Sequence, residues 1–213
     1  MEERHILGRV QRKELTVNAK IIVGPLPLLV LLTACSPGQM SPATADDETP
    51  ETTRSSAPIE RKEIEAAQAK WCAALIEIGK AGAGGGDAKA VAGQVLSSAY
   101  DYDSGTVLFK PTLTFGERTF RMTKPGALAY FVGGDPDFPD DKGFALKPWT
   151  KCRSEIAGVV ENGDMAIAMG NVYLEAANGD KVMVDKTFGY RRTADGALKI
   201  VLHHSSLPYT PAK

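Results

Sequence analysis

Apolar residues recur every three or four positions early in the chain, which is typical of an amphipathic helix. This spacing predicts one long helix from about Ser56 to Gly79, ended by the glycine-rich segment 81–86. The residues that set the spacing are Ile64, Ala67, Trp71, Leu75 and Ile78. Asp87 is a suitable N-cap and predicts a second helix. The apolar face of that helix would carry Val91, Val95, Leu96 and Ala99.

The pattern then changes to the alternation of polar and apolar residues that is typical of strands. Segments 106–114 and 118–121 predict two strands around a turn at Gly116. A short helix is expected over Lys124 to Val132, before a pair of glycines. Gly143 to Trp149 is expected to form a bend or a short edge segment, because it contains a proline.

The clearest pattern is a series of four strand-like segments in the last third of the chain. They cover approximately residues 150–161, 164–177, 180–192 and 197–206. They are separated by Asn162-Gly163, Asn178-Gly179 and Asp195-Gly196, dipeptides that supply the positive φ angles of tight hairpins. Helices followed by such a meander predict an α+β domain. The long helix should lie across a curved antiparallel sheet, with a pocket for a small ligand between them.

The amino-terminal segment has the order of features found in a bacterial lipoprotein signal. Lys20 precedes the apolar run 21–31, which is too short to cross a bilayer. The next residues, Leu32-Thr33-Ala34-Cys35, resemble a lipobox. We therefore expect residues 1–34 to be a signal peptide and Cys35 to carry the lipid. An ordinary secretory signal is the alternative.

Residues 35–57 are rich in Ser, Thr, Pro, Asp and Glu and contain almost no large apolar side chains. Such a segment buries too little surface to fold, so we expect a flexible, lipid-anchored tether. Ser36, rather than Asp, follows Cys35, which favours the outer membrane and a periplasmic location in a Gram-negative host. Residues 58–213 would then form the folded domain.

Composition and charge are those of an ordinary globular protein. Apolar residues make up 43% of the chain and charged residues 24%, and the net charge is -1. Residues 1–34 hold five basic and three acidic residues, so 20 basic and 23 acidic residues remain after them, a charge of -3. This mild acidity argues against a nucleic-acid partner, because proteins that bind nucleic acids normally have a basic surface.

The last predicted strand concentrates polar chemistry. It contains His203 and His204, two of the three histidines, followed by Ser205 and Ser206. Because successive side chains of a strand point to opposite faces, a cavity-facing Ser205 would bring His203 and Val201 to the same side. Buried imidazole and hydroxyl groups need hydrogen-bond partners, and a small polar ligand would supply them.

Ordered blocks across residues 60–210 resemble the iota-class carbonic anhydrases. These belong to the NTF2-like superfamily, as does the association domain of calcium/calmodulin-dependent kinase II, which the organisation also resembles. The blocks are Lys110-Pro111-Thr112-Leu113-Thr114, Ala127-Leu128-Ala129-Tyr130-Phe131-Val132-Gly133-Gly134, Gly143-Phe144-Ala145-Leu146-Lys147, Met169-Gly170-Asn171-Val172, Val184-Asp185-Lys186-Thr187-Phe188-Gly189-Tyr190 and His203-His204-Ser205-Ser206-Leu207-Pro208. The resemblance implies an NTF2-like cone that forms homodimers and interconverts carbon dioxide and bicarbonate. It also implies that Thr112, Tyr130 and Ser205 line the bicarbonate cavity.

Members of that family have been described as metal-free and as using zinc or manganese, so the need for a metal must be inferred from the residues of this chain. The usual carbonic anhydrase zinc site needs three imidazoles. Apart from His5 in the expected signal peptide, only His203 and His204 are present, on opposite faces of one strand. A metal-free site is favoured, although Cys72 or Cys152 could complete a mixed zinc or manganese site. These cysteines could also form a disulfide in an oxidising periplasm, but two small buried hydrophobic residues are favoured.

Without a metal, water must be activated by hydrogen bonds and by a base whose pKa lies near neutrality. The candidate catalytic residues are Thr112, Tyr130, Ser205 and His203. The three hydroxyl groups would orient water and bicarbonate oxygens, and His203 would orient one of them or relay a proton. A core histidine bonded to a carbonyl is the alternative. Asp185 and Lys186 alternate faces, so one of them could line the pocket.

Two other functions stay open. The same cone could be a non-catalytic oligomerisation or small-ligand-binding module, because a fold does not fix a function. It could also house another cavity enzyme of the superfamily, such as a hydrolase or an isomerase. That class relies on an Asp/His pair in the cone, and no such pair is evident in the sequence.

Overall fold

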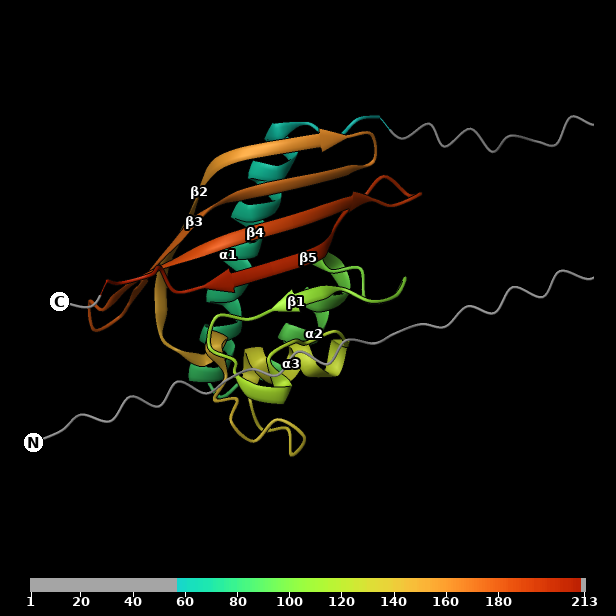
Figure 1. The fold of residues 1–213 in the computed structure, drawn as a ribbon. Coiled ribbons are helices and arrows are strands. Elements are labelled where there is room, and N and C mark those ends of the chain that lie inside the picture. Colours follow the sequence, from blue (N-terminus) through green and yellow to red (C-terminus); the bar gives the residue numbers. More distant parts are fainter. Residues whose placement is uncertain (1–56, 212–213) are drawn as a thin grey trace, which may run out of the picture. The chain divides into compact units, whose positions relative to one another are not determined.

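A computed structural model describes residues 57–211, in which helices pack on one face of a five-stranded sheet (Figure 1). The helices and strands are α1 (Arg61–Ala83), α2 (Ala88–Ala99), β1 (Leu108–Lys110), η1 (Gly116–Arg118), α3 (Lys124–Val132), η2 (Phe144–Leu146), β2 (Trp149–Asn162), β3 (Met165–Ala176), β4 (Lys181–Arg192) and β5 (Leu198–Ser206). The predicted α+β class is confirmed. The expected signal peptide, Cys35 and all but the last residue of the expected tether lie outside the described residues. Among the helices that are described, none has the length and apolar character needed to span a bilayer.

Helix α1 is longer at its end than the sequence predicts. It passes through Gly79 and Gly82 and stops only at Gly84. At its start, the backbone N–H of Glu60 donates to the Glu63 carboxylate at 2.9 Å, which satisfies one of the free donors of the first turn. Gly79 lies against the backbone, where a Cβ would come within 2.8 Å of the Ala145 carbonyl oxygen. The glycine therefore permits close packing of α1 on η2 and does not end the helix.

The predicted meander is confirmed by the antiparallel pairing of β2, β3, β4 and β5. Each connecting turn contains a glycine with positive φ, at Gly163 (61°), Gly179 (88°) and Gly196 (85°). The preceding Asn and Asp residues keep negative φ angles, so only the second residue of each dipeptide uses the left-handed region. The sheet order is β1-β5-β4-β3-β2, with α1 crossing one face (Figure 1).

The predicted hairpin around Gly116 is wrong. Only Leu108–Lys110 forms a strand, and it pairs in parallel with β5. The backbone N–H of Arg121 donates to the Phe109 carbonyl oxygen at 2.8 Å, but residues 118–121 form no strand. Pro111 follows this strand and has no N–H to continue the ladder, so the chain turns away at Thr112. The pairing of Lys110 with His204 nevertheless brings the next residues of the turn beside the end of β5.

Cys72 and Cys152 form a disulfide, so the favoured interpretation as two buried thiols is wrong. Cys72 lies on the buried face of α1 and Cys152 on the edge strand β2, and their Cα atoms are 5.2 Å apart. The bridge closes a loop with a sequence separation of 80 residues. In the chain-entropy model, such a cross-link stabilises the fold by about 4.5 kcal/mol. It fastens the long helix to the far edge of the sheet.

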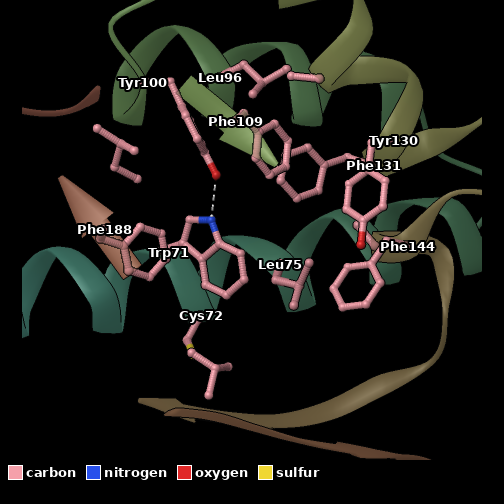
Figure 2. Close-up of a cluster of buried hydrophobic side chains, with 14 of the residues drawn as sticks. Trp71, Cys72, Leu75, Leu96, Tyr100, Phe109, Tyr130, Phe131, Phe144 and Phe188 are labelled. Carbon is pink, nitrogen blue, oxygen red and sulfur yellow. Dashed lines mark hydrogen bonds between the residues drawn. The ribbon is translucent and has the colours of Figure 1, made fainter. Parts of the chain in front are cut away.

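Aromatic side chains fill the space between the helices and β1 and β5. Figure 2 shows this cluster, in which the Trp71 indole of α1 faces the Tyr100 hydroxyl at the end of α2. The rings of Phe109 and Phe131 stack with centroids 5.9 Å apart, and Phe188 approaches Trp71 edge-on at 5.8 Å. Burial of such large rings supplies much of the hydrophobic stabilisation of the domain. The polar site described next lies against this core.

Candidate functional site

Two of the predicted hydroxyl groups meet at the end of β5. Thr112 Oγ1 and Ser205 Oγ are 2.5 Å apart, and Ser205 is fully buried. The parallel pairing of β1 with β5 causes this contact, because it carries the turn after Pro111 alongside Ser205. Lys110 also holds this end of β5, because its Nζ donates to the Ser205 carbonyl oxygen at 2.8 Å.

Tyr130, the third predicted hydroxyl, approaches the same turn from α3. Its hydroxyl is buried and has no hydrogen-bond partner within residues 57–211. Burial raises the pKa of Tyr130 to about 12, and the nearby Thr112 hydroxyl opposes that rise only in part. Tyr130 also lines a cavity of about 310 Å³ together with Leu113 and Phe144. A buried neutral hydroxyl without a partner needs a hydrogen bond, which a small polar ligand at this place would supply.

The face assignment along β5 is right for the polar residues and wrong for one apolar residue. His203 and Ser205 are buried, while His204 is exposed. Val201 does not share their face, because a bulge pairs Tyr190 with Ile200 and Gly189 with Leu202 and leaves Val201 between them. Ile200 occupies the inner face instead.

His203 belongs to a buried chain of hydrogen bonds that connects four elements, namely α1, the end of α2, β5 and β4. The Trp71 indole N–H donates to the Tyr100 hydroxyl at 2.9 Å. That hydroxyl is 2.9 Å from Nδ1 of His203, and Nε2 of His203 is 2.6 Å from Nζ of Lys186. The imidazole stacks between two further rings, Phe109 and Phe188, each with its centroid at 4.6 Å. Within residues 57–211, neither ring nitrogen bonds to a carbonyl.

Burial lowers the pKa of His203 well below its usual range, and the neighbouring Lys186 lowers it further. A charged imidazole would lose its hydration between aromatic rings, so the neutral form is strongly favoured. His203 is therefore a neutral hydrogen-bonding group at neutral pH, and its two nitrogens are already engaged.

The sequence predicts that either Asp185 or Lys186 faces the pocket, and in the structure Lys186 is the one that faces inward. It is 6% exposed, whereas Asp185 faces the other side of the sheet and accepts a hydrogen bond from Asn171 at 2.9 Å. Among the described residues, no carboxylate forms an ion pair with Lys186. Burial, and then the positive charge of Lys110, lower the pKa of Lys186 to about 7. A buried lysine without a counter-charge and with a lowered pKa is a candidate for a catalytic acid or base.

The sequence predicts Thr112, Tyr130, Ser205 and His203 as site residues, and the structure brings Thr112 and Ser205 into contact. Of the hydrogen-bond chain around His203, the sequence predicts Trp71 only as a core residue of the first helix and gives no role to Tyr100. The alternation at Asp185 and Lys186 was the one available signal. Nothing in the spacing of residues 71, 100, 186 and 203 indicates that they meet, because their contact depends on how α1 and α2 pack on the sheet.

The residues present do not fit the mixed metal site that was kept as an alternative. Both candidate cysteines are used by the disulfide, and both nitrogens of His203 have partners. No group of three or more His, Cys, Asp or Glu side chains within the described range is arranged to hold a metal ion. The polar groups at the site are hydroxyls, an amine and an imidazole.

Comparison with known proteins agrees with this donor set. The family model described as "Metal-independent carbonic anhydrase" matches residues 62–207. The chain belongs to this family. A "Metal-independent carbonic anhydrase" of Nostoc sp. (strain PCC 7120) is 41% identical over 193 residues, which cover 90% of this chain and 93% of that protein.

One solved structure gives the same result. The iota-carbonic anhydrase from a cyanobacterium, complexed with bicarbonate, matches at a TM-score of 0.71 and 45% identity, covering 77% of this chain and 99% of that chain. An NTF2-like superfamily protein from Salmonella enterica matches at a TM-score of 0.45 and 12% identity, over 71% and 92% of the two chains. The resemblance stated from the sequence blocks is thus confirmed, and the chain is a metal-independent carbonic anhydrase of the iota class.

Proposed function

We propose that this carbonic anhydrase hydrates carbon dioxide at the contact between Thr112 and Ser205, with Tyr130 facing the same point. The 2.5 Å hydroxyl contact beside an unpartnered tyrosine hydroxyl is the observation that carries this assignment. It gives three neutral groups that can each donate or accept a hydrogen bond. Such groups can orient a water molecule and the oxygens of bicarbonate without a metal ion.

The surroundings suit the two reactants. Carbon dioxide is apolar, and the rings of Tyr130 and Phe144 form the aromatic part of a cavity next to the Thr112 turn, whose lining also includes Asp140, Asp141, Lys142 and Lys147. Bicarbonate is an anion, and the hydroxyl donors stabilise the charge that develops on its oxygens. In a site shielded from water, each preorganised donor contributes about 3 kcal/mol to transition-state stabilisation. Behind Ser205, His203 contacts the amine of Lys186, the residue that pairs with Ser205 across β4 and β5.

Replacement of Thr112 by Ala in the full chain should reduce the turnover number for carbon dioxide hydration about 100-fold, because one preorganised donor is lost. Thr112→Ser keeps the hydroxyl and serves as the matched control, which should stay near the wild-type rate. Stopped-flow hydration after exhaustive chelation measures both variants and the wild type. Equal rates for Thr112→Ala and wild type would refute the site, and loss of wild-type activity on chelation would refute its independence of metals.

We also propose that two copies associate through the outer face of the sheet. This face exposes apolar side chains on neighbouring strands, namely Val160 (69% exposed), Ile167 (48%), Met169 (61%) and Met183 (37%). Val160 and Ile167 are directly paired across β2 and β3. An apolar surface of this kind is typical of an interface, and the family resemblance implies a homodimer.

Light scattering coupled to size-exclusion chromatography tests this association. The double variant Ile167→Lys, Met169→Lys should elute as a monomer, because two charges would be buried without partners in the interface. Asn178→Lys, in the turn between β3 and β4, adds a charge away from this patch and should leave the mass of a dimer. A monomeric wild type would disprove the proposal.

Finally, we propose that Cys35 anchors the enzyme to the outer membrane on its periplasmic side. The support is the sequence alone: an apolar segment, small residues and then cysteine, followed by Ser36. Cys35→Ser should move the protein from the membrane fraction to the soluble fraction of Gram-negative cells that express the full chain. Retention of this variant in the membrane fraction would contradict lipid anchoring.

A further inference from the structure

We infer that Lys186 is the base of the reaction, and that its Nζ accepts the proton of the water that attacks carbon dioxide. This inference rests on the proposed function of the hydroxyl site. It adds a catalytic residue beyond the hydroxyl groups and His203.

The register of the sheet places Lys186 at the site. Lys186 on β4 is paired directly with Ser205 on β5, and both side chains are buried on the inner face. Side chains in such a pair have Cβ atoms about 4.5–5.5 Å apart. The lysine stem therefore runs beside the serine whose hydroxyl contacts Thr112.

The hydrogen-bond chain behind Lys186 has a direction, and that direction favours a neutral amine. The indole N–H of Trp71 can only donate, so the Tyr100 oxygen accepts from it and the Tyr100 O–H is free to donate to Nδ1 of His203. The proton of the neutral imidazole is then on Nε2, which donates to Nζ of Lys186. Only an amine has a lone pair that can accept this hydrogen bond.

An ammonium group would break this order. Nζ would donate to Nε2, the imidazole proton would move to Nδ1, and the Tyr100 oxygen would accept from both His203 and Trp71. The Tyr100 O–H would lose its partner inside the core, which costs about 1–3 kcal/mol. These hydrogen bonds therefore favour the amine form of Lys186 as long as no anion is bound that would stabilise the ammonium form.

The other groups at the site are poor bases. Threonine and serine hydroxyls do not ionise near neutral pH, and burial raises the pKa of Tyr130 to about 12. His203 accepts at Nδ1 from Tyr100, and burial lowers its pKa well below its usual range. Lys186 is the inward-facing group whose proton exchange falls near neutrality, with a pKa of about 7.

The groups that face Lys186 come from all the elements around it. Lys110 on β1 lowers the pKa of Lys186 because it carries a like charge. His203 on β5 contacts Nζ of Lys186, and Tyr100 after α2 in turn contacts His203, so these two residues form the hydrogen-bond chain behind the amine. From α1, the Trp71 ring has its centroid 4.6 Å from Nζ, a position that stabilises a cation. On β3 the paired residue is Gly170, which has no side chain. These opposing effects allow the amine both to take a proton and to release it.

The proposed step conserves atoms and charge. The water oxygen forms a bond to the carbon of carbon dioxide while one water O–H bond breaks and its proton moves to the lone pair of Nζ. The electron pair of one C=O π bond moves to its oxygen, so bicarbonate and the Lys186 ammonium are formed. As Nζ turns toward the water, Nε2–H of His203 is released to donate to the new oxyanion. Departure of bicarbonate removes the counter-charge, and the ammonium returns its proton to buffer.

Lys186→Met in the full chain tests the base directly, because methionine has a similar length and suits a buried position. Wild-type kcat for hydration should rise with pH through one ionisation near 7, as the amine form accumulates. The variant should lose at least about 100-fold in kcat and lose that ionisation. Lys181→Met, at the exposed start of the same strand, should keep both. A Lys186→Met enzyme with near wild-type kcat and the same pH profile would overturn the inference, whereas an inactive wild type would overturn the proposed function.

Tyr100→Phe provides a second test that does not remove the lysine. Without the Tyr100 O–H, the Nε2–H form of His203 loses its support, so the ammonium form of Lys186 gains. The midpoint of the kcat profile should move to higher pH by about one unit. Tyr102→Phe removes a hydroxyl that donates to the Arg121 carbonyl and should leave the midpoint in place. A midpoint that stays put or moves down in Tyr100→Phe would overturn the inference.

Discussion

A single donor, the indole N–H of Trp71, sets the direction of the buried polar chain on which the site depends. It is 2.9 Å from the Tyr100 hydroxyl and cannot accept a proton in return. The hydrogen bonds beyond it, from Tyr100 to His203 and from His203 to Lys186, then favour one order of donors and acceptors, because in the reverse order the Tyr100 O–H has no partner. A buried polar network is costly when one member lacks a partner. The aromatic core around these hydrogen bonds therefore favours one arrangement of donors and acceptors.

The position of that chain follows from the way the helices are held on the sheet. Trp71 lies one residue before Cys72, whose disulfide to Cys152 fastens α1 to the edge strand β2. Tyr100 ends α2 and also forms a bridge to Ile200 of β5. These attachments bring the indole and the phenol to the imidazole from two separate helices. The fold thus contributes to the chemistry mainly by limiting how the buried donors can turn.

The meander was predictable because three glycine-containing turns and alternating residues specify local pairing. The same alternation correctly places His203 and Ser205 on the inner face. It fails at Val201, because the bulge there shifts the register of β5. The parallel pairing of β1 was not predictable, since it joins segments about 90 residues apart in sequence and no local pattern encodes it. The resemblance of the sequence blocks implies Thr112, Tyr130 and Ser205 as site residues, and the alternation along β5 adds His203; their roles stay predictions. The hydrogen bonds that join Trp71, Tyr100, His203 and Lys186 depend on long-range packing, which no local pattern encodes.

The tautomer of His203 is the most direct measure of this account. Nitrogen NMR of the full-length enzyme with ¹⁵N-labelled histidine, recorded above neutral pH without bicarbonate, distinguishes a protonated ring nitrogen from a bare one. We predict a neutral ring with the proton on Nε2 and a bare Nδ1 that accepts from Tyr100. A proton on Nδ1, or on both nitrogens, would contradict it, because Lys186 would then have no donor that keeps it an amine.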